Sequence, residues 1–77
     1  MRYAVVIEKA IANFSAYVPD LPGCVATGAT PAEARHLIRE AIEVHLSSLV
    51  DDGAAIPEPT SRVEYVEVGE PEDPPHA

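Results

Sequence analysis

The feature that most constrains this chain is a strong helix signal near its middle. Thr30 is followed by Pro31 and then by Glu33, which is the capping-box pattern with proline at the first helical position. Gly53 is expected to end the helix in a left-handed conformation. We therefore predict one helix from Pro31 to about Asp52. Because 77 residues form one domain at most, the rest of the chain must pack around it.

The predicted helix has one apolar face. At about 100° per residue, this face carries Ala34, Leu37, Ile38, Ala41, Ile42, His45 and Leu49. Leu46 and Val50 lie beside the stripe, where a solvated helix would be polar, and a subunit contact would explain them. Domains this small usually need extra stabilisation from a disulfide, a bound metal or a partner subunit. One cysteine cannot form an internal disulfide, and no Cys and His cluster has metal-ligand spacing, so we expect a homodimer or tetramer.

Short segments with period-two alternation flank the helix and predict strands. They cover residues 2–9, 13–18 and 24–27 before the helix and residues 62–68 after it. The first two are close enough in sequence to form an antiparallel hairpin. The order β-β-β-α-β predicts an α+β fold in which one helix packs on a small four-stranded sheet. We assign residues 1–69 to this domain and residues 70–77 to a disordered, acidic, proline-rich tail.

The segment "VPDLPGCVATGAT", residues 18–30, is typical of a rigid turn, here called the corner, between two strands. Asp20 is expected to cap a turn through its own backbone amides, and Pro22 stiffens the corner. Gly23 and Gly28 match neither a dinucleotide-binding nor a P-loop pattern, so they imply no cofactor. Their simplest use is a positive φ at a turn and at a strand end.

Two residues are candidates for catalysis, Cys24 and His45. A nucleophilic cysteine needs its thiolate stabilised by a nearby histidine, a cation or a helix N-terminus, and no spacing forces one next to Cys24. Free cysteine is usually a buried core residue. His45 lies near the middle of the apolar helix face, where a neutral, hydrogen-bonded core histidine is expected. An enzyme that uses either residue is the least favoured interpretation.

Charge limits the classes of partner. The net charge is −8, and three of the 13 acidic residues lie in residues 70–77, which leaves ten acids against five bases, or −5, in the body. Such a body repels nucleic-acid phosphates and attracts basic proteins. No run of about 18 apolar residues predicts a membrane span, and the N-terminus does not resemble a signal peptide. A free thiol suits a reducing compartment, so we expect a cytoplasmic protein.

Several motifs in order resemble the HicB family of antitoxins: "PDLPGCVATGATPAEA", then "EAIEVHL" and "DGAAIPEP". The resemblance implies a truncated ribonuclease-H-like β-β-β-α-β fold in which Asp20, Pro22, Gly23, Gly28, Thr30, Glu33, His45 and Gly53 are structural. It also implies a non-catalytic antitoxin of a type II toxin–antitoxin pair. Its partner would be a small basic HicA-type ribonuclease that cuts messenger RNA. Many family members continue into a DNA-binding domain, and we expect no direct DNA binding by this chain because none follows.

Exposure and charge suggest where the partner binds. The proposed contact residues are Tyr17, Glu64, Tyr65 and Glu67, on a sheet face or edge. The alternative function is an oligomeric regulatory or ligand-binding module without a toxin partner.

Overall fold

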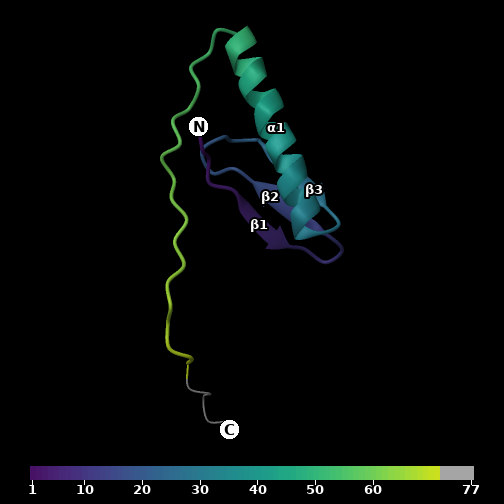
Figure 1. Ribbon diagram of the computed structural model, residues 1–77, viewed down its shortest axis with the longest axis vertical. Helices are drawn as coiled ribbons and strands as arrows, with labels where there is room; N and C mark the ends of the chain where they lie inside the picture. Colours follow the sequence, from purple (N-terminus) through teal and green to yellow (C-terminus); the bar gives the residue numbers. More distant parts are fainter. Residues whose placement is uncertain (72–77) are drawn as a thin grey trace.

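A computed structural model describes residues 1–71, which contain three strands and one helix. Figure 1 shows how they are arranged and how the C-terminal segment extends alongside them. The strands are β1 (Val6–Lys9), β2 (Phe14–Tyr17) and β3 (Val25–Gly28), and the helix is α1 (Pro31–Asp51). The strands form one antiparallel sheet in the order β1-β2-β3. The predicted α+β class is therefore confirmed. No helix within residues 1–71 is long and apolar enough to cross a membrane.

The sheet has an inner and an outer face that follow from its register. Ala16 of β2 lies between Ile7 of β1 and Ala26 of β3, on the side that the helix covers. Tyr17 lies between Val6 and Val25, on the opposite face. The three predicted N-terminal strands are confirmed, although β1 and β2 are shorter than the alternating segments that predicted them.

The helix begins and ends where the sequence predicts. Thr30 is extended, with φ −132°, and its hydroxyl accepts a hydrogen bond of 3.0 Å from the Glu33 N–H. Gly53 has φ +69°, and its N–H and that of Asp52 bond back to carbonyls of the last turn, as expected for a left-handed helix end. The predicted helix boundary is confirmed to within one residue.

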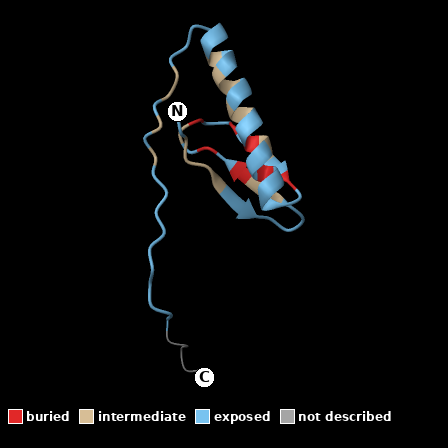
Figure 2. Ribbon diagram, viewed as in Figure 1, coloured by how far each residue is buried: buried red, intermediate tan, exposed pale blue. Residues whose placement is uncertain are grey.

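The core is small and lies under the N-terminal half of the helix. The helix packs chiefly against β3, less against β2 and least against β1. The buried residues, red in Figure 2, are Ala16, Val18, Leu21, Cys24, Ala34 and Ile38. The C-terminal half of the helix extends beyond the strands (Figure 1), so much of its apolar face is only half-buried. The space over β1 is left partly open.

The two corner glycines have different roles. Gly23 has φ +82°, as predicted. The prediction for Gly28 was wrong, because Gly28 has no positive φ. Instead, a Cβ at Gly28 would lie 2.5 Å from the backbone N of Ala34. Glycine is needed there because the first turn of the helix approaches the end of β3 so closely that no side chain fits.

The predicted four-stranded sheet is not confirmed. Residues 62–68 are extended but pair with no strand among residues 1–71, so the described sheet has three strands. Alternation gives a segment the potential to form a strand, but a strand also needs an edge with which to pair. After Ser61 the segment runs away from β1 (Figure 1). The ribonuclease-H-like assignment and the domain end at residue 69 remain predictions. Most of the predicted tail, residues 72–77, lies outside the described residues.

Candidate partner-binding surface

Asp20 attaches the C-terminal segment to the folded body. Its carboxylate accepts hydrogen bonds from the Ser61 N–H at 3.0 Å, the Ser61 hydroxyl at 2.8 Å and the Thr60 hydroxyl at 3.2 Å. The backbone bond from Ser61, followed by that from its hydroxyl, holds the pKa of the Asp20 carboxyl below its usual 3.8. The expectation that Asp20 caps its own turn is corrected. The turn is closed by backbone bonds from Leu21 to Val18 and from Cys24 to Leu21, which leaves the carboxylate free for the distant segment.

A second contact fixes the path of the segment beside the N-terminus. The Tyr3 hydroxyl donates a 2.6 Å hydrogen bond to the Pro57 carbonyl. Ile56, Pro57 and Pro59 are half-buried along this stretch. Residues 54–61 therefore return from the helix end along the body, and Ser61 is the last attachment point.

Beyond Ser61 the segment is exposed. Its exposed large apolar side chains are Val63, Tyr65, Val66 and Val68, at 54%, 97%, 77% and 77% of full exposure. Glu64 and Glu67 are also exposed, and Glu64 forms an ion pair of 2.8 Å with Arg62. Monomeric surfaces rarely present so many apolar residues together. This composition is typical of a segment that another surface covers.

Tyr17 belongs to a different surface. It lies on the outer face of the sheet, 40% exposed, beside Val25, which is 65% exposed. No hydrogen bond or ion pair between described residues joins Tyr17 to Glu64, Tyr65 or Glu67. All four predicted contact residues are accessible, but the structure does not assemble them into one site within a single chain, and the contact itself stays a prediction.

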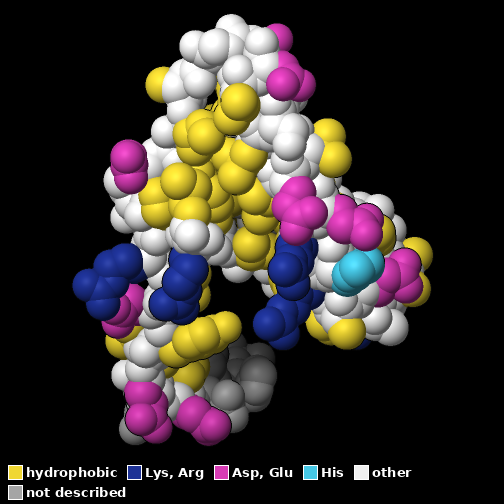
Figure 3. Space-filling view, turned by 45° about the horizontal axis from the view of Figure 1, so that its top comes forward, with side chains coloured by type: hydrophobic (Ala, Val, Ile, Leu, Met, Phe, Trp, Pro, Cys, Tyr) yellow, Lys and Arg dark blue, Asp and Glu magenta, His cyan; other side chains and the backbone are white. Residues whose placement is uncertain are grey.

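An open apolar groove of about 680 Å³ lies between the helix and the N-terminal residues. Its apolar lining consists of Met1, Tyr3, Val5, Ala32, Ile38, Ile42 and Leu46. Arg35, His36, Arg39 and Glu43 line its polar margin. Figure 3 shows hydrophobic side chains gathered at the centre of this face, with Lys and Arg side chains beneath them. The groove exists because the helix lies over β3 and β2 and leaves β1 poorly covered.

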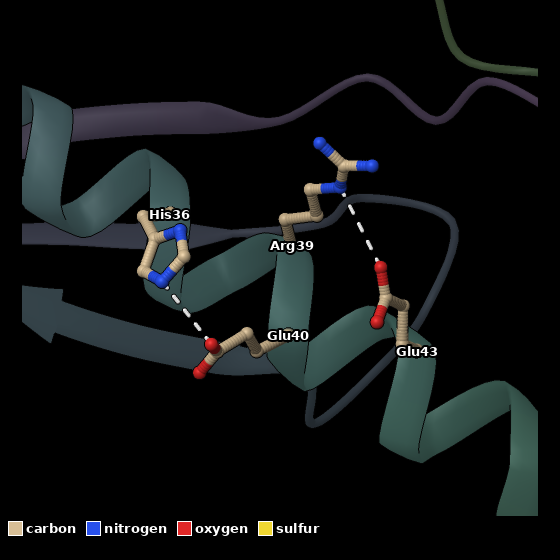
Figure 4. A network of polar contacts seen from close by, with 4 residues as sticks. All are labelled: His36, Arg39, Glu40 and Glu43. Atoms are coloured by element: carbon tan, nitrogen blue, oxygen red, sulfur yellow. Dashed lines mark ion pairs between the residues drawn. The ribbon is translucent and has the colours of Figure 1, made fainter.

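Two residues of the polar margin, His36 and Arg39, each pair with a glutamate one helical turn away. His36 Nε2 lies 3.1 Å from a Glu40 oxygen, and Arg39 Nε lies 3.5 Å from a Glu43 oxygen (Figure 4). These pairs were not predicted, although the (i, i+4) spacing of opposite charges in "HLIREAIE" is a recognisable signal for them. The link from Asp20 to Ser61 has no comparable signal.

The structure does bring the two catalytic candidates to one place. Cys24 and His45 both line a shallow hollow between the corner and the helix. However, Cys24 is only 5% exposed, and burial raises the pKa of its thiol, which disfavours the thiolate that a nucleophile needs. His45 is half-buried, lies outside the buried core and has no side-chain hydrogen bond to another described residue. The expectation of a hydrogen-bonded core histidine is therefore wrong for the described part of the chain. This hollow therefore does not support a nucleophilic site. Among residues 1–71, no three Cys, His, Asp or Glu residues are grouped as metal ligands.

Comparisons with known proteins identify relatives over most of the chain. Residues 3–73 match the family described as "HicB_like antitoxin of bacterial toxin-antitoxin system". An uncharacterised 14.9 kDa protein of Haemophilus phage HP1 is 33% identical over 95% of this chain, and the chain spans about half its length, 55%. A UPF0150 protein of Helicobacter pylori is 46% identical over 65% of this chain and 69% of its own length.

One solved structure is similar in fold and in sequence. A chain of the structure titled "HicA3 and HicB3 toxin-antitoxin complex" superimposes with a TM-score of 0.67 at 33% identity. The match covers 78% of this chain and 70% of that chain. The strand–strand–strand–helix arrangement is therefore one found in a toxin–antitoxin complex.

Proposed function

The chain belongs to the family of HicB-like antitoxins of bacterial toxin–antitoxin systems, and from this premise we propose that it is a non-catalytic antitoxin. In this proposal it binds and masks a small basic HicA-type ribonuclease that cleaves messenger RNA. The observation that carries the proposal is the match to a chain of the HicA3 and HicB3 complex, at 33% identity and a TM-score of 0.67. The proposal places the chain in the cytoplasm, where a free thiol persists.

The charge of the chain supports a basic partner. Its net charge is −8, and the accessible Glu64 and Glu67 contribute to the negative surface of the C-terminal segment. Complementary charge accelerates association and disfavours wrong partners. We assign the contact to Tyr17, Glu64, Tyr65 and Glu67. The two tyrosines would supply aromatic area of the kind that dominates interface energetics.

The test uses the chain together with small basic HicA-like proteins encoded in the same genome. Each is purified with this chain, and affinity is measured by calorimetry alongside inhibition of messenger RNA cleavage. Tight binding with loss of cleavage is the expected result. If no HicA-like protein binds, the antitoxin proposal is wrong.

A charge-reversal pair locates the contact. Replacing Glu64 and Glu67 with Lys should weaken toxin binding, whereas replacing Asp51 and Asp52 with Lys changes the net charge equally at the exposed helix end and should have a smaller effect. Equal effects of the two double variants would show that overall charge acts and that the assigned patch is wrong.

The open groove favours a second candidate function. A groove of about 680 Å³ with an apolar floor is large enough for a small ligand, as an oligomeric regulatory or ligand-binding module would require. Binding of an apolar fluorescent probe in the groove, together with failure of every HicA-like protein to bind, would favour this function over the antitoxin.

A further inference from the structure

The groove and the exposed segment fit each other, and we propose that they do so between two copies of this chain. Residues 62–68 of one copy add as a strand to the free edge of β1 in the second copy. Residues 62–68 of the second copy pair in the same way with β1 of the first. This inference specifies the homo-oligomer expected from the sequence and does not require the toxin. It explains why the chain carries a strand-like segment that pairs with no strand among residues 1–71.

The β1 edge of the described sheet is open. β1 is an edge strand, since β2 pairs with it on one side and no described strand on the other. Edge strands with unpaired backbone groups invite pairing with another chain. β1 spans four residues, Val6–Lys9, or about 13 Å at roughly 3.3 Å per residue, so the segment of residues 62–68 is long enough to cover its free edge. Strand addition would pair the backbone groups of both.

The C-terminal segment is directed away from its own sheet. The bonds of Asp20 to Ser61 and of Tyr3 to Pro57 hold residues 57–61 against the body. Beyond Ser61 the segment projects past the strands (Figure 1), and the chain extends over 61 Å along its longest axis. The anchors thus present residues 62–68 to a neighbour instead of to their own β1. Exchange of such an element is a low-cost route to a dimer.

The side chains of residues 62–68 complement those of the groove. In a strand, Glu64, Val66 and Val68 share one face, and Val63, Tyr65 and Glu67 share the other. We assign the first face to the groove. The two valines would then cover its apolar floor, and Glu64 would meet the basic margin formed by Arg35 and Arg39. Between residues 1–71, Arg35 has no ion pair and so is available for Glu64.

The same assignment has a consequence for the proposed toxin contact. Tyr65 and Glu67 of the donated strand would lie on the outer face of the sheet, which is the face that carries Tyr17. Tyr17, Tyr65 and Glu67, which a single chain keeps apart, would then lie on one face of the sheet. Glu64 would lie in the groove of the second copy and would affect toxin binding only through the dimer. The exchanged dimer itself does not depend on the proposed function. Only its consequence for the toxin contact rests on that function.

The test is made on the full chain without any toxin, by sedimentation equilibrium. The unaltered protein is expected at about twice the 8.2 kDa of one chain. Replacing Glu64 and Tyr65 together with Pro should give the single-chain mass, because successive N–H groups of a strand point to opposite sides and one of the two must face β1. Gly69→Pro with Glu70→Pro is the matched control beyond the strand and should remain dimeric. Circular dichroism checks that the helix is intact in both variants.

Charge reversals then test which face of the donated strand lies in the groove and whether Arg35 and Arg39 of the second copy contact it. Glu64→Arg should raise the dimer dissociation constant by about tenfold, and Glu67→Arg should leave it nearly unchanged. Replacing Arg35 and Arg39 with Glu should weaken the dimer similarly, and adding these changes to Glu64→Arg should restore it. A monomeric unaltered chain, a dimer that survives the double proline, or a dimer insensitive to Arg35 and Arg39 would each overturn the proposal. None of these results depends on whether a HicA-like protein binds.

Discussion

The carboxylate of Asp20 holds Ser61 by two hydrogen bonds, from its N–H at 3.0 Å and from its hydroxyl at 2.8 Å, across 41 positions of sequence. This link joins the corner after β2 to the segment after the helix. It determines where the chain stops following the body and where the exposed, apolar residues 62–68 begin. The position of the proposed interaction surface therefore depends on one side chain in a corner that is otherwise structural.

Asp20→Asn should loosen this link and remove its dependence on pH. The folded pKa of Asp20 lies below 3.8, so the carboxylate contributes its full stabilisation above that value and loses it as the pH falls through the lower folded pKa. In NMR titrations, the Ser61 amide signal should be constant near neutral pH and should shift in acid with a midpoint below 3.8. The signal should show no such transition in the Asn variant. Asp51→Asn, at the exposed helix end, is the control, and a midpoint at or above 3.8 would contradict the assignment.

Gly28→Ala should destabilise the fold because its Cβ would lie 2.5 Å from the Ala34 backbone N. Backbone cannot move aside as a flexible side chain can, so we expect a loss of roughly 1–3 kcal/mol in the free energy of unfolding by urea. Gly69→Ala has nothing within 4 Å of its new Cβ and should be nearly neutral. Equal stabilities of the two variants would show that the close approach of helix and strand is wrong.

Thr30→Ala should cost about 1 kcal/mol of stability, because it removes the acceptor of the Glu33 N–H at the helix start. Thr30→Ser keeps a hydroxyl in the same place and should recover most of the loss. Urea denaturation followed by circular dichroism measures both variants. If alanine were tolerated as well as serine, the cap would not stabilise the helix.

Cys24 should react slowly with a thiol reagent in the folded protein and rapidly once the chain is unfolded. It is 5% exposed, and burial raises the pKa of its thiol, so both access and thiolate content are low. The control moves the cysteine by one position, with Val25→Cys in a Cys24→Ala chain, since Val25 is 65% exposed. Rapid modification of native Cys24 would reopen the nucleophile hypothesis.

Local sequence was enough to determine the helix, its two ends and the three N-terminal strands. The Thr30 cap, the Gly53 end and the alternation of residues in the hairpins each act within a few positions, so their signals can be read directly. The family motifs were also visible in the sequence. Accessibility of Tyr17, Glu64, Tyr65 and Glu67 followed from their polarity and from the alternation of the segments that carry them.

Tertiary structure alone decided three other features. Asp20 bonds to Ser61 instead of its own turn, Gly28 serves close packing instead of a positive φ, and residues 62–68 are extended without a partner strand. Each depends on groups that are distant in sequence, or on an edge that must be free when the segment reaches it. Alternation specifies that a segment can pair, whereas the path of the chain in space determines what it pairs with.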